Sequence, residues 1–457
     1  MEETSALAEF AATTTYDDIP TDAVEKAKRA IQDYLGVALY GSEHGVGERI
    51  SAYVDRCLPG EEAAVLGRGA ASPPGAALAN GAFGHAIDYD DTFESIVIHP
   101  TSPVFPAALA GAQVAGGSGR DVLTAYVVGA EAAFRTGHAT YPSHYDNGWH
   151  STGTVGTFGA AAAAASALGL DAEETARAFG IAASCSSSLK KNFGTMTKPL
   201  HAGHAAQMGV RAASLAEAGF TADDAVFEGD IGYGEVMTPG GDYDPAEITE
   251  DLGETWAVHD IGFKPYPSGV ITHAAMDALR ELVEREGLEP ADVESVRVAL
   301  DQAASEMLIH ADPDDALQAK FSIEFCLAAV LREGDAGVRE FSDEYVTDPR
   351  TREVTAKVER DFEENLFGGE FAGYGARVTV TTRDGDEFEA VEKYAPGSPN
   401  NPVSDERLDA KFFECAEPIV GRERAEAVAS AVADLETEGA LDRLLANATT
   451  DGDGEAP

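Results

Sequence analysis

VGTFGAAAAAASAL, residues 155–168, is the stretch of the sequence that decides the fold. Alanine is the strongest helix former, and the interrupting glycines and serine keep the run short of the ~18 apolar residues that cross a membrane. Small side chains let helix backbones approach one another closely, so we expect a helix packed inside a bundle. Gly169 follows the run, at the position where a glycine commonly ends a helix.

Similar patterns of small and apolar residues cover most of the first two-thirds of the chain. Apolar residues recur near helical spacing between Ala23 and Leu39, and Thr21 is placed to cap this helix. The same reasoning predicts further helices at about 104–114, 121–136, 172–184, 201–218 and 222–227.

The composition changes after Tyr266-Pro267. Two alternating runs, 376–382 and 387–394, flank Asp384-Gly385, and an Asp-Gly pair between such runs is a strong signal for a β-hairpin. In the same region we expect a strand at about 295–300 and helices at about 271–286 and 319–331. A helical segment at about 405–447 is expected to follow this region.

These patterns together predict a mainly α fold with an inserted α+β domain. We expect residues 1–266 and 401–447 to form one large helical domain, and residues 267–400 to form a smaller α+β domain. The stretch PGSPNNP, 396–402, is rich in residues that end regular structure and is the expected linker. Residues 448–457 are expected to form a disordered tail.

The balance of charge is unusual. The chain has 80 acidic and 32 basic side chains and a formal net charge of −48, whereas its 44% of hydrophobic residues is ordinary for a folded protein. These values favour a folded protein with a carboxylate-covered surface. The charge, without a basic stripe, argues against nucleic acid and anionic membranes as partners.

We therefore predict a halophilic protein. Molar salt shortens the Debye length to about 3 Å and removes most of the repulsion between surface carboxylates. The melting temperature should rise from low to molar KCl, as measured by thermal unfolding. A melting temperature that is the same at both concentrations would contradict this prediction.

The expected location is the cytoplasm. The first residues, MEETSALAEF, lack the basic and apolar segments of a signal peptide. The cysteines, at positions 57, 185, 326 and 415, are widely separated, and no close pair indicates a zinc or iron–sulfur site. This pattern is typical of a reducing compartment.

The segment HAIDYDDTFESIVIHPTSP, 85–103, interrupts an Ala/Gly-rich helix with a cluster of polar residues. Three of its carboxylates lie within four residues, and such a cluster needs a cation or raises the pKa of its members. Each aspartate alone is as well explained as a helix cap. The whole set, with two histidines and a prolyl turn, favours a functional site.

Three further segments place polar groups beside glycine or proline. GWHSTG, 148–153, precedes a helix N-terminus, where an anion is favoured, although a simple capped turn fits equally well. KPLHAGH, 198–204, puts a scarce lysine in a bend before an apolar helix, which suits carboxylate binding or Schiff-base chemistry. FKPYPSG, 263–269, lies where the composition changes, which is typical of a cleft or of a hinge.

The sequence contains no Rossmann fingerprint, P-loop, nucleophile elbow or zincin helix. An acid–base site that uses no metal and acts on a small anion fits these residues better than a nucleotide site. In so acidic a protein, an anionic substrate needs local positive charge, which Lys198, Lys264 and the histidines would supply.

Five segments in order carry a resemblance to a known family: GHAIDYDDT, GWHSTGTVGTFG, KPLHAGHAAQMG, KPYPSGVITHAAMDAL and QAKFSIEFCLAAVL. Over roughly residues 5–447 the chain resembles the MmgE/PrpD family, which includes 2-methylcitrate dehydratase, cis-aconitate decarboxylase and an iminodisuccinate epimerase. The resemblance implies a large helical domain, an α+β lid domain, a homodimer and no metal or organic cofactor.

The resemblance also implies which residues line the active cleft. His99 would move a proton at the carbon next to a substrate carboxylate, and Asp88 would orient His99. The expected catalytic residues are Asp88, His99, His150 and Lys198, and the expected substrate-binding residues are Thr92, Lys198, Lys264 and His273.

The expected activity is that of a cofactor-free lyase acting on a small di- or tricarboxylic acid. A 2-methylcitrate dehydratase is favoured, because Gly269 stands where the decarboxylase branch carries a histidine. Decarboxylation of cis-aconitate and epimerisation of iminodisuccinate are alternatives on the same scaffold. A hydrolase whose metal is bound by Asp88, Asp90 and Asp91 is an alternative of another class, and a non-catalytic carboxylate-binding protein is a third.

Overall fold

The structure, a computed structural model, describes residues 2–368 and 374–450. The chain forms two compact units, one made of Met1–Gly262 with Leu408–Pro457 and the other of Phe263–Arg407. The first is helical and the second contains a mixed sheet with helices, so the predicted mainly α fold with an α+β part is confirmed. Of the tail predicted at 448–457, Ala448 ends a helix and residues 451–457 lie outside the described part.

The helices of the first unit are packed around α8, Ser151–Leu168, which is almost entirely buried. Small residues make this packing close, as predicted. A Cβ atom added to Gly159 would lie 2.7 Å from the backbone oxygen of Gly129 on α6, and one added to Gly209 on α10 would lie 2.4 Å from Ala160.

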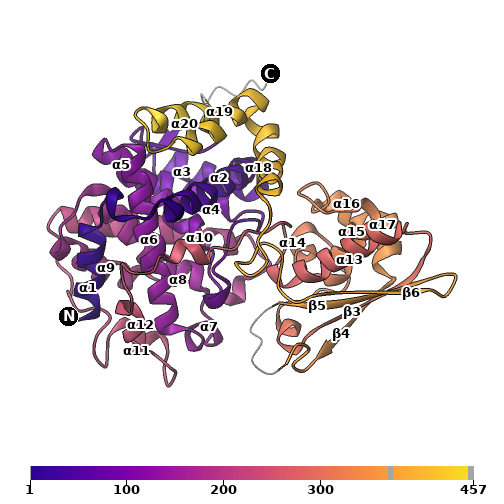
Figure 1. The fold of residues 1–457 in the computed structure, drawn as a ribbon. Coiled ribbons are helices and arrows are strands. Elements are labelled where there is room, and N and C mark those ends of the chain that lie inside the picture. The colour runs from indigo at the N-terminus through magenta and orange to yellow at the C-terminus, as the bar shows by residue number, and fades with distance from the viewer. Residues whose placement is uncertain (1, 369–373, 451–457) are drawn as a thin grey trace. The chain divides into compact units, whose positions relative to one another are not determined.

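The other helices of this unit lie against α8 or further out from it (Figure 1). They are α1 Glu3–Thr13, α2 Thr21–Glu43, α3 Gly45–Cys57, α4 Pro73–Gly84, α5 Thr101–Ala115, α6 Gly119–Thr140, α7 Ser143–Asp146, α9 Ala172–Cys185, α10 Thr197–Glu217, α11 Tyr233–Met237, α12 Ala246–Thr249, α18 Asp405–Val420, α19 Arg422–Ala433 and α20 Ala440–Ala448. A short hairpin of β1, Ala63–Ala64, and β2, Ala70–Ala71, lies between α3 and α4 in the chain.

The helix predicted at 222–227 is absent, and this prediction was wrong. The backbone N–H of Phe227 donates to the Thr4 hydroxyl at 3.2 Å, and the backbone N–H of Thr4 donates to Glu228. Tertiary contacts with α1 therefore replace the hydrogen bonds that a local helix would have made.

The C-terminal helices return to the N-terminal part of the chain, and in Figure 1 the yellow α18 lies beside the indigo α2. A buried ion pair connects them, with Lys411 Nζ 2.6 Å from Asp33 Oδ1. The same ammonium donates to the backbone oxygen of Tyr89 at 2.7 Å. Lys411 thereby connects α2, α18 and the polar loop that follows α4.

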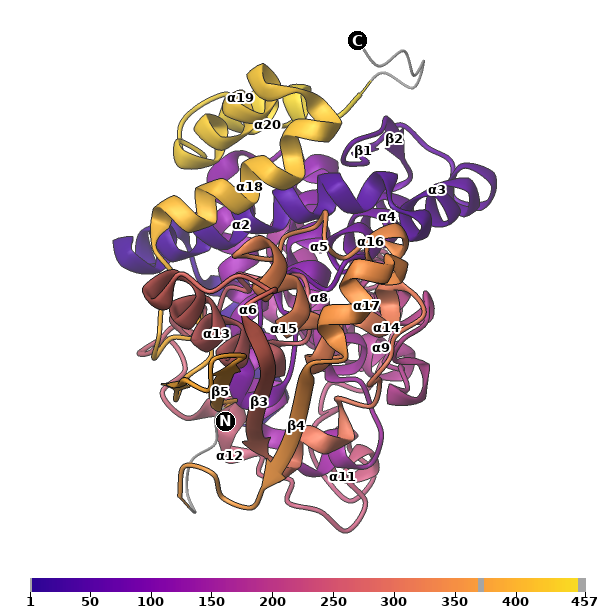
Figure 2. The same cartoon turned by 90° about the vertical axis from the view of Figure 1, so that its right-hand side faces the viewer.

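The second unit is built on a four-stranded sheet of order β4-β3-β5-β6. The predicted hairpin is confirmed, because β5, Ala376–Thr382, pairs antiparallel with β6, Glu387–Glu392. The predicted strand at 295–300 is β3, Val293–Asp301, and in Figure 2 it lies between β5 and β4, Val358–Glu363. Pairing of β4 with β3 is parallel.

Helices cover one face of this sheet, as Figure 1 shows. The helix predicted at 319–331 is divided in two, because Ser322 caps a new helix by accepting from the backbone N–H of Phe325 at 3.2 Å. The helices are α13 His273–Glu286, α14 Ala316–Ala319, α15 Ile323–Glu333, α16 Asp343–Thr347 and α17 Pro349–Thr355. Across the described ranges of both units, we find no helix with the length and apolarity needed to cross a membrane.

Candidate active site

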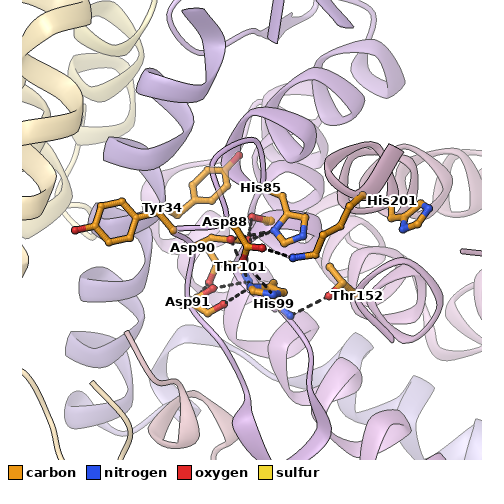
Figure 3. A network of polar contacts seen from close by, with 12 residues as sticks. Tyr34, His85, Asp88, Asp90, Asp91, His99, Thr101, Thr152 and His201 are labelled. Carbon is orange, nitrogen blue, oxygen red and sulfur yellow. Dashed lines mark hydrogen bonds and ion pairs between the residues drawn. The ribbon is translucent and has the colours of Figure 1, made fainter. Parts of the chain in front are cut away.

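The predicted polar segment lies where the chain turns from α4 to α5. Helix α4 ends at Gly84, and Asp88 then adopts a left-handed backbone conformation with φ of 57°. Aspartate tolerates this conformation better than most residues do. Figure 3 shows His85, Asp88, Asp90 and His99 gathered at this turn.

His99 has a defined orientation in this group. Its Nδ1 lies 3.0 Å from the backbone oxygen of Asp91, and its backbone N–H donates to the Thr152 hydroxyl at 3.1 Å. A carbonyl oxygen only accepts, so Nδ1 carries a hydrogen in this arrangement. The other ring nitrogen, Nε2, lies 4.0 Å from Asp88 Oδ1, where it is available for proton transfer.

Lys198 forms a buried ion pair with Asp88. Lys198 lies in the first turn of α10, so the predicted bend at this position is instead the start of the helix. The direct partner of Asp88 is therefore the ammonium group of Lys198. Asp91 and Asp90 hold His99 through Nδ1, while Asp88 Oδ1 lies 4.0 Å from Nε2, so the orienting role expected of Asp88 stays a prediction.

His150 is the N-cap residue of α8 and lies against the same group, as its ring centroid is 5.9 Å from that of His85. Burial lowers the pKa of His150 well below its ordinary value, and the nearby Lys198 charge acts in the same direction. This ring is therefore neutral near pH 7. It suits hydrogen bonding to a substrate better than holding a charge.

His201 is a site residue that the sequence analysis did not select. Its Nδ1 lies 3.0 Å from Nδ1 of His150, so one ring donates to the other. Burial lowers the pKa of His201 to about 4, so this pair is neutral as well. The sequence signal that could have identified His201 is its spacing from Lys198, because residues three positions apart lie on the same face of a helix.

Thr92 lies beside the turn, in an antiparallel bridge with Gly262. Its hydroxyl oxygen is buried and has no hydrogen-bond partner among the described residues. A buried hydroxyl without a partner is costly, so the hydroxyl is well placed to donate to a bound carboxylate. The substrate-binding role of Thr92 stays a prediction.

Asp91 turns away from the group and is held by α5. The Thr101 hydroxyl donates to one of its oxygens, and the Thr101 backbone N–H donates to the other at 3.2 Å. Burial raises the pKa of Asp91 to about 8. Its side chain is therefore protonated near pH 7 and serves the structure.

Four side chains of metal-ligand type converge here, with ligand atoms within 4.8 Å of one another: His85, Asp88, Asp90 and His99. Asp91, which the metal-dependent alternative needs, is not among them. The ammonium of Lys198 already supplies positive charge to Asp88. A lysine at this point repels a divalent cation, so the donor set fits a metal poorly.

Lys264 and His273, the other predicted substrate-binding residues, belong to the second unit. Both side chains are buried. His273 Nε2 lies 3.2 Å from the backbone oxygen of Ser268, to which it donates. The group formed within the first unit therefore contains five of the seven predicted site residues, and the roles of these two stay predictions.

A cavity of about 670 Å³ opens beside His201 in the first unit. Its walls are mainly apolar, and no aspartate, glutamate, lysine or arginine of the described residues lines it. Such a cavity is poorly suited to a molecule with several carboxylates. The buried Asp88–Lys198 group is the better candidate site for an anion.

Two family models match the chain. The MmgE/PrpD N-terminal domain matches residues 5–246, and the MmgE/PrpD C-terminal domain matches residues 266–437. Together they cover most of both units.

Several proteins of similar length resemble this chain along nearly its whole length. Cis-aconitate decarboxylase of Mus musculus is 30% identical over 439 residues, which cover 92% of this chain and 89% of that protein. The protein of the same name from Homo sapiens is 30% identical over 90% of this chain and 87% of its own length. The one from Aspergillus terreus is 28% identical over 95% of this chain and 93% of its own length.

Proposed function

The chain belongs to the MmgE/PrpD family, and on this premise we propose that it is a cofactor-free lyase acting on a small di- or tricarboxylic acid. The observation that carries the proposal is the buried Asp88–Lys198 pair beside His99. It combines one cation for a substrate carboxylate with one imidazole that can exchange a proton.

The Lys198 ammonium would bind a substrate carboxylate in exchange for part of its contact with Asp88. An ammonium suits this task because it offers three donors and a compact charge. The Thr92 hydroxyl and the neutral His150 would donate further hydrogen bonds. These groups would place the carbon next to that carboxylate close to His99 Nε2.

His99 would act on this carbon as an acid or a base. In a decarboxylation, the carbon–carbon bond to a carboxylate breaks, carbon dioxide leaves, and the remaining electron pair takes a proton from the imidazolium. In a dehydration, the neutral ring takes a proton from the carbon, and the resulting imidazolium gives a proton to the hydroxyl on the neighbouring carbon, which leaves as water. Both reactions form negative charge next to a carboxylate, which Lys198 would stabilise.

Cis-aconitate decarboxylation is the first reaction to test, because the similar proteins described above carry that name. Dehydration of 2-methylcitrate is the second candidate. The observation that favours it is Gly269, which offers no proton-transfer group at the position where the family resemblance implies a histidine in the decarboxylase branch. A Cβ atom there would meet the Phe321 ring at 3.4 Å and the Ile271 side chain at 3.6 Å.

The test is an NMR screen of citrate, 2-methylcitrate, cis-aconitate and related acids with the purified protein in molar KCl. Product formation and exchange of substrate protons with D₂O are followed together. Turnover of one acid identifies the reaction, and exchange without product identifies the carbon that the protein deprotonates. If no acid is converted and none exchanges a proton, the proposal is wrong.

Activity should survive removal of divalent metals. The ammonium of Lys198 already supplies positive charge to the Asp88 carboxylate, so no metal cation is needed there. We therefore expect kcat to be unchanged after exhaustive treatment with EDTA followed by desalting. Addition of Mg²⁺, Mn²⁺ or Zn²⁺ to the treated protein is the control. A loss on chelation that a metal restores would support the metal-dependent hydrolase instead.

A further inference from the structure

Asp90 lies at the centre of a chain of buried polar contacts that the proposed function leaves unused. Its carboxylate is fully buried, and its Oδ2 lies 2.9 Å from His85 Nδ1 and accepts from the Ser102 hydroxyl at 2.6 Å. Its other oxygen, Oδ1, lies 3.4 Å from His99 Nδ1. Figure 3 shows Asp90 between His85 and His99.

The partners of Asp90 differ in whether they can hold charge. Burial lowers the pKa of His85 to about 4, although Asp90 acts in the opposite direction, so His85 donates from Nδ1 as a neutral ring. Ser102 is neutral as well. For Asp90, burial alone would raise the pKa, but the two histidines outweigh it and hold that pKa well below its usual range. The buried carboxylate of Asp90 is therefore held by neutral donors. His99 is the neighbouring ring that reaches solvent, with 12% of its side chain exposed.

We infer that Asp90 is a positioning residue whose negative charge stabilises the protonated ring of His99. His85 and Ser102 fix the carboxylate, and Asp90 then attracts the positive charge that His99 acquires when Nε2 takes a proton. This inference rests on the proposed function, since it assumes that His99 is the group that exchanges a proton. It adds a charge partner that neither the family resemblance nor the motif assigned.

Other charged and titratable groups also face His99. Asp88 lies 4.0 Å from Nε2, while the ring centroid of His85 lies 4.4 Å from that of His99. The remaining titratable groups of the site are His150 from the start of α8 and Lys198 from α10, whereas the Asp91 carboxyl is turned toward Thr101. The positive charge of Lys198 is opposite in sign to that of Asp90, so the two groups act on a charged ring in opposite directions.

The experiment is an NMR titration of the His99 ring in the intact protein, labelled with ¹⁵N-histidine in molar KCl and assigned with His99→Gln. Asp90→Asn keeps the size of the side chain and removes its charge. A ring that has lost a neighbouring anion holds its proton less tightly, so the pH at which His99 titrates should fall by about 1–3 units. The acid limb of kcat/KM should move in the same direction.

Asp91→Asn is the matched control, because that neighbouring carboxyl is already protonated below about pH 8 and its replacement removes no charge. His99 should titrate in this variant as in the wild type. If Asp90→Asn does not fold, Asp90→Ser offers a second neutral side chain with the same expected shift.

The inference is overturned if a folded neutral variant at position 90 leaves the His99 titration unchanged, or if Asp91→Asn shifts it equally. The titration needs no substrate, so it judges this inference even if the screen of acids finds no activity. Conversely, if the protein turns over a substrate but Asp90→Asn does not change the pH at which His99 titrates, the proposed function stands and this inference is wrong.

Discussion

Replacing Lys198 with methionine should abolish most of the activity, with kcat/KM falling about 10²–10³-fold, which corresponds to the loss of a buried charged contact. Methionine keeps much of the length of the lysine chain and removes its charge. The substrate carboxylate then has no ammonium to bind, and the change should appear in both KM and kcat. Initial rates on the acid that the screen identifies provide the measurement.

The same substitution should destabilise the protein by about 3–5 kcal/mol, because the buried Asp88 carboxylate would lose its ion pair with the Lys198 ammonium. The double variant Asp88→Asn/Lys198→Met separates the two effects, since it should recover most of the stability and none of the activity. Lys191→Met, which changes an exposed lysine of the preceding segment, is the matched control and should behave as the wild type. Normal turnover by Lys198→Met would exclude the ammonium from the reaction.

Replacing His99 with glutamine should lower kcat by about 10²–10⁴-fold, the usual contribution of a positioned acid or base. The glutamine amide can still donate to the backbone oxygen of Asp91, so the loop should keep its conformation. Lys198 and Thr92 are unchanged, and KM should move much less than kcat. The variant therefore separates proton transfer from substrate binding.

His138→Gln is the control for this variant, because His138 lies outside the site and contacts the Ser95 hydroxyl at 3.2 Å. Circular dichroism and thermal melting should be the same for both variants and the wild type. Near-normal turnover by a folded His99→Gln protein would remove His99 from the mechanism and transfer the search for the base to His150.

The site was predictable where its signals were local. Asp88, Thr92 and His99 lie in one short segment whose density of polar groups stands out against an apolar helix. Lys198 stood out because lysine is scarce in this chain. His201 was missed because its spacing from Lys198 indicates only a shared helix face, and the sequence does not show that His150 lies against that face.

The contact between Asp90 and His99 was missed for a related reason. Spacing in the loop gives Asp88, Asp90 and Asp91 similar chances of reaching the ring. The left-handed backbone at Asp88 turns that carboxylate toward Lys198, and the following turn leaves Asp90 beside His99 Nδ1. Backbone conformation of this kind depends on the packing around the loop.

The sequence by itself determined the class of fold, because helical and alternating periodicities are local properties of the chain. It also determined the hairpin of β5 and β6, since Asp384-Gly385 defines that turn. The tertiary structure alone decided the contacts between distant segments. Asp88 meets Lys198 across 110 positions, and Lys411 reaches Asp33 and Tyr89 from the other end of the chain. Such pairs arise from the packing of small-residue helices, and no local pattern encodes which buried charge will find which partner.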